Sequence, residues 1–262
     1  MADSPERPFS PGIGAVFEVV ARLRAAGGCP WDREQTHESL RPYLLEETYE
    51  LLEAIDSGDD AKIMEELGDL LLQVAMHAEI AAGESRFTAA QVSEAVAAKM
   101  VARHPHVFGS MSVSDADEVL RNWEHQKVHE ARKAGREDES VVDRVPATLP
   151  ALAWTLGLQK RAARVGFDFE STDETAEAVA EEARELAAAT DARETFEEMG
   201  DLLFAIVSLA RRLKVNPEDA LRVAGQRFRR RFADTEASLR KDGVSFGDLD
   251  SDEQAKRWKA TS

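Results

Sequence analysis

Apolar residues recur every three to four positions along most of this 262-residue chain, a spacing that gathers side chains on one face of a helix. The first such segment runs from Ile13 to Ala26 and ends at two consecutive glycines, a natural stop for a helix. Further helices are predicted over about 39–56, 60–82, 88–103, 115–133, 151–165, 173–189, 193–214 and 216–241. The pattern therefore predicts an all-α protein.

Capping signals mark several of the predicted helix ends. Gly58 is suited to end one helix and Asp59 to cap the next, so these two helices should form a hairpin. Thr88 and Gln91 have the spacing of a capping box. Asn216 is followed by a proline, which is favoured at the first helical position.

Acidic residues are arranged alike in two of the predicted hairpins. Glu-Glu-x-x-Glu at 46–50 is followed by Glu-x-x-Asp at 66–69, and the same arrangement returns at 181–185 and 198–201. Because residues three apart share a helix face, each hairpin is predicted to bring two acidic pairs together. Glu46 and Glu181 are 135 residues apart, and Asp69 and Asp201 are 132 apart. Two related helical units therefore lie in tandem.

A polar, proline-bounded stretch at 135–150 separates the two copies. We expect an N-terminal helical domain over 12–134, a linker over 135–150 and a C-terminal helical domain over 151–262. The chain is long enough for two domains with cores of their own.

The acidic clusters favour a hard metal ion. Four carboxylates that face one another repel and need a cation to stay ionised, and an all-oxygen set suits Mg²⁺ or Mn²⁺ better than zinc. The alternative is a solvated acidic helix face, which is the commoner origin of such patterns. Leucines at helical spacing among the acids place the clusters beside a core-facing stripe, and the arrangement occurs twice, so we favour the metal interpretation.

A glycine precedes the last acid of each cluster, at Gly68 and Gly200. Glycine inside a helix costs about 1 kcal/mol relative to alanine. We expect that close helix packing or access for a metal requires the space at these positions.

Composition excludes several classes of function. A formal net charge of −17 argues against a general binder of nucleic acid or of anionic membranes. No run approaches eighteen apolar residues, and residues 1–11 contain three prolines and no apolar run, so neither a membrane span nor a signal peptide is expected. The single Cys29 rules out an internal disulfide and suits a reducing cytoplasm.

Other candidate residues have plainer interpretations. His77 is expected to be a core or interface histidine, and Trp31 is expected to pack rather than to stack on a base. Lys127, in the helix predicted over 115–133, is a candidate phosphate contact. The chain contains no Gly-x-x-x-x-Gly-Lys loop and no Gly-x-Ser-x-Gly elbow, so P-loop chemistry and serine nucleophiles have no support.

Together with the acidic repeats, three further motifs carry a family resemblance. They are Gly-Cys-Pro-Trp-Asp at 28–32, Arg-His-Pro-His-Val-Phe at 103–108 and Val-Gly-Phe-Asp at 165–168. In this order they resemble the MazG nucleoside triphosphate pyrophosphohydrolases, from about residue 12 to Trp258. The resemblance implies tandem MazG-type helical bundles. It also implies Mg²⁺-dependent hydrolysis of nucleoside triphosphates to monophosphate and pyrophosphate, a house-cleaning activity on nucleotide pools.

The resemblance also implies roles for particular residues. The family's metal ligands match Glu47, Glu50, Glu66 and Asp69 in the first unit and Glu182, Glu185, Glu198 and Asp201 in the second. We expect the second set to be the catalytic one. Arg227 and Arg231 fall at phosphate-contacting positions, Trp258 falls where a ring can stack on the base, and Lys127 fits the same phosphate role.

The chain departs from the family pattern in the second unit. Gly225-Gln226-Arg227-Phe228 stands where the family tends to show Asn-x-Lys-Phe, and Ala178 and Glu194 occupy positions where lysines can occur. Arginine keeps the charge of lysine and changes its geometry. These departures bear on nucleotide affinity and base preference, and they leave the acidic set intact.

Two classes of function stay open at this stage. The first is the enzyme, and the alternative is a non-catalytic helical scaffold that senses nucleotide or metal without turnover. The apolar stripes also predict a homodimer of interleaved bundles, against the alternative of packing within one chain.

Overall fold

The computed structural model describes residues 12–115, 118–119 and 140–261, and structural statements refer to these ranges. The chain divides into two compact units, residues 1–134 and 135–262. All regular elements in the described ranges are helices, so the all-α prediction is confirmed. Most of the helix predicted over 115–133, including Lys127, lies outside these ranges.

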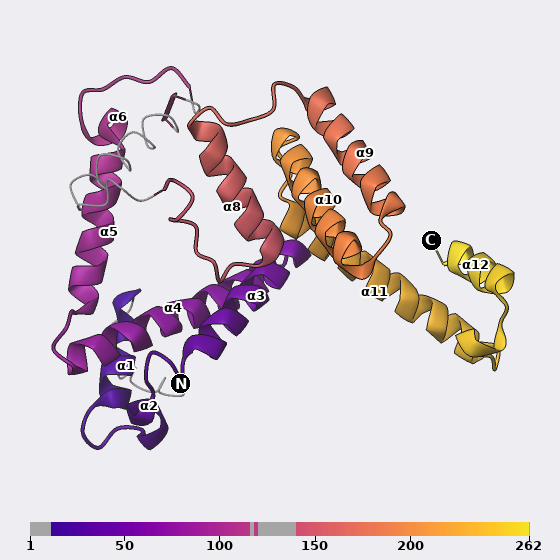
Figure 1. The fold of residues 1–262 in the computed structure, drawn as a ribbon. Coiled ribbons are helices and arrows are strands. Elements are labelled where there is room, and N and C mark those ends of the chain that lie inside the picture. Colours follow the sequence, from indigo (N-terminus) through magenta and orange to yellow (C-terminus); the bar gives the residue numbers. More distant parts are fainter. Residues whose placement is uncertain (1–11, 116–117, 120–139, 262) are drawn as a thin grey trace. The chain divides into compact units, whose positions relative to one another are not determined.

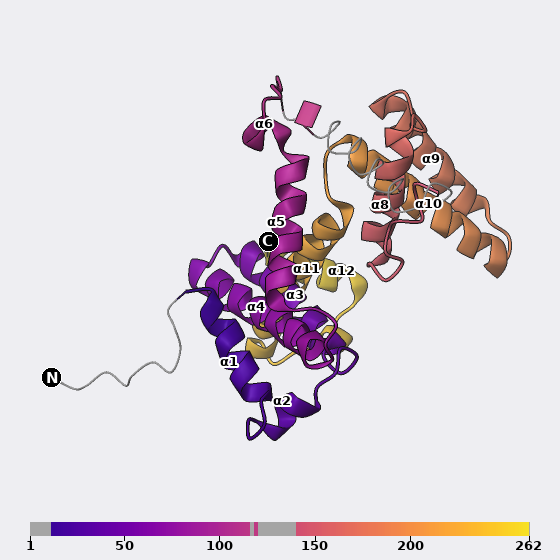
Figure 2. The same cartoon turned by 90° about the vertical axis from the view of Figure 1, so that its left-hand side faces the viewer.

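The first unit is organised around its longest described helix, α4 (Asp60–Gly83), which packs against α3 (Arg41–Ser57) and α1 (Gly14–Arg24) (Figures 1 and 2). The remaining described helices are α2 (Pro30–Glu34), α5 (Ala89–Arg103) and α6 (Pro105–Phe108). The buried core consists of Val20, Leu40, Ala75, Met76 and Ile80. The core of the first unit therefore lies at the C-terminal half of α4.

The acidic half of the α3–α4 hairpin is much more exposed than this core. Leu45, Met64 and Leu67 are 58%, 73% and 52% exposed. These three apolar side chains beside the acids are thus largely uncovered by the described residues of their unit.

The second unit is organised around α10 (Ala192–Arg212), which packs against α9 (Thr172–Ala188) and α8 (Ala151–Arg164) (Figure 1). The long α11 (Pro217–Lys241) packs on α8 and, after a 3₁₀ turn at Phe246–Asp248, against α12 (Ser251–Ala260). Residues 140–150, which precede α8, pack against this helix. Val145 is buried, and Arg161 of α8 donates to the carbonyl of Arg144 at 3.1 Å.

The capping predictions are confirmed. Gly58 ends α3 in the left-handed region at φ +67°, and Asp59 accepts from the backbone N–H groups of Ala61 and Lys62. Thr88 and Gln91 form the reciprocal capping box. Asn216 caps α11, with proline at its first position. These ends are local events, which is why the sequence predicts them well.

Some expectations need correction. Two short helices are absent from the predicted set: α2, which starts at Pro30, and α12, which contains Trp258. Trp31 is 52% exposed, and its described ring contact is an edge-to-face arrangement with Tyr43, with the centroids 6.1 Å apart. Within the described ranges, no helix is both long and apolar enough to cross a membrane.

Candidate metal centres

The first acidic set lies across the α3–α4 hairpin. One carboxylate oxygen from each of Glu47, Glu66 and Asp69 lies within 4.8 Å of the others. Burial raises the pKa of Glu47, as do the carboxylates of Asp69 and Glu50. Burial also raises the pKa of Glu66, followed by the charges of Glu50 and Asp69. Glu50 is not one of the three closest groups, but its charge acts on both glutamates.

The second set has the same construction across α9 and α10. Oxygens of Glu182, Glu185 and Glu198 lie within 4.8 Å of one another. Burial raises the pKa of Glu182 and of Glu198, and in each case the carboxylates of Glu185 and Asp201 follow as causes. Asp201 is exposed and, like Glu50, influences the set by charge without belonging to its closest three.

The spacing fits a divalent cation bound by oxygen. Two ligands on opposite sides of one Mg²⁺ are about 4.2 Å apart, since each bond is about 2.1 Å long. The three oxygens of either set can reach that separation with small side-chain adjustments. The raised pKa values also show that each set favours positive charge, because carboxylates that repel one another are stabilised by protons or by a cation.

The glycines beside the acids do not serve close packing inside their units. A Cβ placed on Gly68 or on Gly200 would meet no atom within 4 Å. The packing explanation is therefore wrong within each unit, and the open space that access to the acidic set would need is present.

At the open end of the first hairpin, which is the end away from the turn at Gly58, two histidines connect the segment before α3 to α4. His37, which precedes α3, lies with its Nδ1 2.7 Å from Nδ1 of His77 on α4, and the ring planes are nearly parallel. Arg86, just after α4, lies 2.5 Å from Nε2 of His37 and forms an ion pair with Glu84. The expectation that His77 packs rather than binds a ligand agrees with this arrangement.

These contacts determine how the protons are placed. Because arginine only donates, Nε2 of His37 accepts, which leaves Nδ1 as the atom that can donate to His77. His37 then donates to His77, whose own proton sits on Nε2. That atom is buried without a partner among the described residues. Burial lowers the pKa of His77, and the neighbouring His37 lowers it further.

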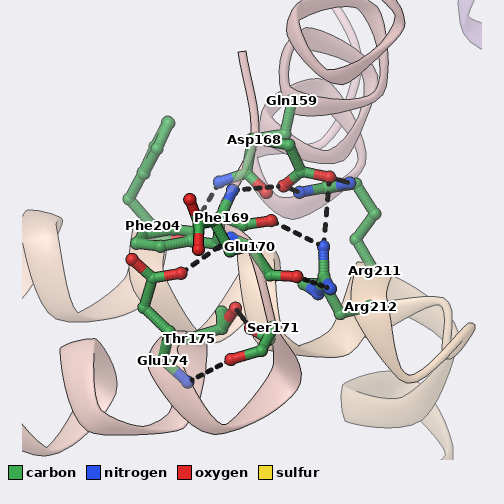
Figure 3. A network of polar contacts seen from close by, with 10 residues as sticks. All are labelled: Gln159, Asp168, Phe169, Glu170, Ser171, Glu174, Thr175, Phe204, Arg211 and Arg212. Carbon is green, nitrogen blue, oxygen red and sulfur yellow. Dashed lines mark hydrogen bonds and ion pairs between the residues drawn. The ribbon is translucent and has the colours of Figure 1, made fainter. Parts of the chain in front are cut away.

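The open end of the second hairpin is joined by a carboxylate and two arginines. Asp168, which precedes α9, accepts from Arg211 with both oxygens, one of them at 2.9 Å, and from Arg212 at 3.4 Å (Figure 3). The Arg211 hydrogen bonds hold the pKa of Asp168 below its ordinary value.

The basic residues expected to contact phosphate differ in availability. Arg227 on α11 is exposed and has no ion pair within the described part of the chain. The Arg231 guanidinium lies over the Trp258 ring, 4.1 Å from its centroid, and its Nε donates to the Trp258 carbonyl at 3.2 Å. Phe228 lies near the same ring, with the centroids 5.4 Å apart. The structure thus brings Arg231 and Trp258 together, and α11 packs on α8 and α12 and touches α10.

The departures in the second unit have structural counterparts. Glu194 accepts from the backbone N–H of Thr190 at 2.6 Å and from its hydroxyl at 2.9 Å, so it shapes the turn between α9 and α10. These bonds lower its pKa. A Cβ on Gly225 would meet no atom within 4 Å, so packing does not require a glycine there.

Sequence reasoning missed the partners that join the open ends. It identified Val-Gly-Phe-Asp at 165–168 as a motif but did not connect it with Arg211 and Arg212, and it overlooked His37 altogether. The adjacent arginines near the end of a predicted helix were the available signal. Nothing local in the sequence pairs them with Asp168.

The two units match two family models. Residues 35–108 match the MazG nucleotide pyrophosphohydrolase domain. Residues 149–228 match phosphoribosyl-ATP pyrophosphohydrolase. The first match contains the acids of the α3–α4 hairpin and the second those of α9 and α10.

Curated relatives match almost the whole chain. It is 42% identical over 250 residues to a nucleoside triphosphate pyrophosphohydrolase/pyrophosphatase MazG of Thermotoga maritima, with 94% of this chain and 95% of that protein covered. It is 40% identical over 253 residues to a nucleoside triphosphate pyrophosphohydrolase of Escherichia coli K12, with 94% and 95% covered. It is also 44% identical over 244 residues to the uncharacterized protein YabN of Bacillus subtilis, with 92% of this chain and 49% of that protein covered.

Proposed function

Because this chain belongs to the MazG family, we propose that it is a divalent-metal-dependent nucleoside triphosphate pyrophosphohydrolase. It converts NTP or dNTP and water into the monophosphate and pyrophosphate, and by doing so clears nucleotide pools. The observation that carries the proposal is the three-oxygen acidic set in each unit, in a chain similar to such enzymes along nearly its full length.

The metal is proposed to be Mg²⁺, with Mn²⁺ as a substitute, since the donors are all carboxylate oxygens. Glu182, Glu185 and Glu198, with Asp201 beside them, would hold it in the second unit. Glu47, Glu66 and Asp69, with Glu50, would hold it in the first. When bound, the cation offsets the charge of the triphosphate and makes a water molecule more nucleophilic. A carboxylate of the set that is not a ligand can accept a hydrogen bond from that water and orient it.

Positive charge for the phosphates is proposed to come from α11 and from Lys127. Arg227 is exposed and unpaired among the described residues, so it is free to contact a phosphate. Lys127 is proposed for the same role. Arg231 covers one face of Trp258, so the ring can stack on a base there only if the guanidinium moves off it. We therefore propose that Arg231 turns toward phosphate as Trp258 takes up the base.

A homodimer is proposed because apolar side chains of both hairpins lack cover within their units. On α10, Phe196 is 82% exposed and Phe204 49% exposed; on α4, Met64 is 73% exposed. A second copy of the chain would bury them, as expected for bundles that share a core. Light scattering on a size-exclusion column should give twice the 28.9 kDa chain mass. The lone Cys29 leaves the cytoplasm as the proposed location.

The decisive experiment is product analysis. Mixed with a panel of canonical and oxidised triphosphates and Mg²⁺, the protein should yield monophosphate and pyrophosphate only, and a chelator should stop the reaction. Nucleoside diphosphate as the main product would indicate cleavage at the γ-phosphate and contradict the proposal. Binding of triphosphate without any turnover would instead support a sensing scaffold.

A further inference from the structure

The segment that leads into α9 is fastened to the far end of α10 by side chains of both. Asp168 forms a bidentate pair with Arg211, and the two side chains are 25% and 13% exposed, so the pair is largely shielded from water. Bidentate pairing between carboxylate and guanidinium fixes orientation as well as distance.

The second arginine fixes the backbone that follows. Arg212 donates to the carbonyl of Phe169 at 2.8 Å and to that of Glu170 at 3.1 Å (Figure 3). Ser171 then caps α9 by accepting from the N–H of Glu174 at 3.0 Å. We call Asp168, Arg211 and Arg212 the clamp. It holds every residue from 168 to 170, immediately before the first turn of α9.

The acidic set lies between the clamp and the turn that joins the two helices. Thr172 and Glu182 are ten residues apart on α9, and Asp201 and Arg211 are ten apart on α10, about 15 Å along each axis at 1.5 Å per residue. Glu182 is seven residues, or about 10 Å, from the start of the turn at Ala189. If the helices were joined only by that turn, a splay of about 10° would separate them by about 2 Å at Glu182, whereas metal ligands need distances correct within about 0.2 Å.

Several buried side chains of α9 and α10 near the clamp are small, and Val207 of α10 is fully buried beside them in the sequence. Thr175 of α9 is fully buried, and Ala205 and Ser208 of α10 are 6% and 3% exposed. The Thr175 hydroxyl is bonded to its own helix, at the Ser171 carbonyl. Small residues bury little apolar area, and the clamp adds a restraint of its own at this end.

We propose that Asp168 is a positioning residue for the metal centre of the second unit. Through Arg211 and Arg212 it holds the angle between α9 and α10, which keeps Glu182 and Glu185 within reach of Glu198. This inference rests on the proposed metal site.

The test uses the full chain with Glu66→Gln, so that binding reports on the second unit. In this parent, Asp168→Asn keeps the shape of the side chain and removes its charge. The dissociation constant for Mn²⁺, measured by electron paramagnetic resonance, should rise about tenfold, as for substitutions behind metal ligands. The metal concentration for half-maximal activity should rise alike, while kcat at saturating metal changes little.

Two variants sharpen the result. Glu177→Gln removes one partner of the exposed Glu177–Arg184 pair on the same helix, and it should leave Mn²⁺ binding unchanged. Asp168→Glu retains a carboxylate, and it should recover part of the lost affinity. If Asp168→Asn fails to fold by circular dichroism, Arg211→Lys, which keeps the charge but not the bidentate bond, takes its place.

The outcomes separate the two proposals. If the parent binds Mn²⁺ and Asp168→Asn binds it equally well, the positioning role is overturned and the metal site stands. The same holds if Glu177→Gln weakens binding as much as Asp168→Asn. If the parent itself binds no Mn²⁺, or binds it as well after Glu198→Gln, the metal site is wrong and the positioning role falls with it.

Discussion

The two acidic hairpins have nearly the same set of carboxylates between their helices. At their open ends they are joined by different kinds of side chains. Each brings three carboxylates together across two helices, with the fourth acid acting through its charge. The first hairpin is joined at its open end by the stacked rings of His37 and His77 with Arg86, and the second by Asp168 with two arginines.

The comparison separates what metal binding requires from what the scaffold requires. A hard cation would be held by oxygen ligands at short mutual distances, and the carboxylates of both clusters supply such ligands. Joining two helix ends needs only complementary partners, and a histidine pair serves as well as an ion pair. Because the groups that join the helix ends differ, the stability of the two hairpins should respond differently to pH.

Among the residues that the structure describes, the units differ again beyond the hairpin. In the second unit, α11 supplies the exposed Arg227, and Arg231 lies against Trp258 of α12. A triphosphate carries several negative charges, so we expect cations of the same unit to favour its binding. This difference makes the second unit the better candidate for turnover.

The largest expected effect tests that choice. Glu198→Gln should lower kcat/KM at least about 100-fold, equivalent to about 2.7 kcal/mol, because it removes a charged ligand from the second cluster. Glu66→Gln should leave most of the activity. Steady-state assays with saturating Mg²⁺ measure both.

Glutamine keeps the size of glutamate, so neither change should unfold its helix. Circular dichroism and an unchanged or slightly higher Tm without metal would check this, since one repelling charge is gone. Should Glu66→Gln prove the more damaging change, the first unit is the catalytic one.

A second test concerns the acidic clusters, of which each unit has one. The raised pKa values of Glu47, Glu66, Glu182 and Glu198 mean that the folded, metal-free protein holds protons more tightly than the unfolded chain. Their contribution to stability is complete below about pH 4.5 and is lost as the pH rises through the raised pKa values. Mg²⁺ should therefore raise Tm more at pH 7.5 than at pH 5. At tenfold excess over its Kd it adds about 1.4 kcal/mol per site.

Scanning calorimetry with and without a chelator at the two pH values measures that increment. Asp168 has a lowered pKa and is ionised at both pH values, so it does not contribute to the difference. An equal Mg²⁺ effect at both pH values would contradict the assignment of the acids as ligands.

Replacing the glycine beside each acidic cluster by alanine should change the stability of the protein alike in the two units. The effect on activity should differ between them. Because an added Cβ meets nothing at either position, Gly68→Ala and Gly200→Ala should each stabilise the protein by about 0.5–1 kcal/mol. Gly200→Ala should also lower kcat/KM if access to the second cluster uses that space, as we expect, and Gly68→Ala should not. Urea unfolding and steady-state assays measure the two effects, and a loss of stability in either variant would show that the space is filled in the assembled protein.

The smallest expected effect comes from the different open ends. His77 has a lowered pKa, so below about pH 6.5 the unfolded chain binds the proton first and stability declines as the pH falls toward 5. Arg86, which is paired with Glu84, contacts His37 from the next segment. His77→Phe keeps a ring there and should flatten this decline. Asp168, with its lowered pKa, should contribute no slope until the pH falls below about 4.

Thermal unfolding in chelator from pH 5 to 7 compares the wild type with His77→Phe. His104→Phe is the control, because this histidine bonds to the Met100 carbonyl within its own helix end. Parallel curves for wild type and His77→Phe would show that the pair does not titrate in this range.

The sequence by itself determined the features that depend on neighbouring residues. Helix ends such as Gly58–Asp59 and Asn216 follow from backbone conformation and capping groups a few residues away. The acidic faces follow from the three-residue spacing of the helix, and the motifs in order identify the family. The same local rules failed at Pro30 and in the tail, where short helices form, because helices this short owe little to intrinsic propensity.

Only the tertiary structure decided which distant groups meet. Asp168 and Arg211 are 43 residues apart and His37 and His77 are 40 apart, so no periodicity connects them. The space beside Gly68 and Gly200, and the cover that Arg231 places over Trp258, likewise depend on how whole helices cross. Each of these contacts contributes little free energy and forms only after the helices have packed. The residue pattern along one helix therefore does not predict it.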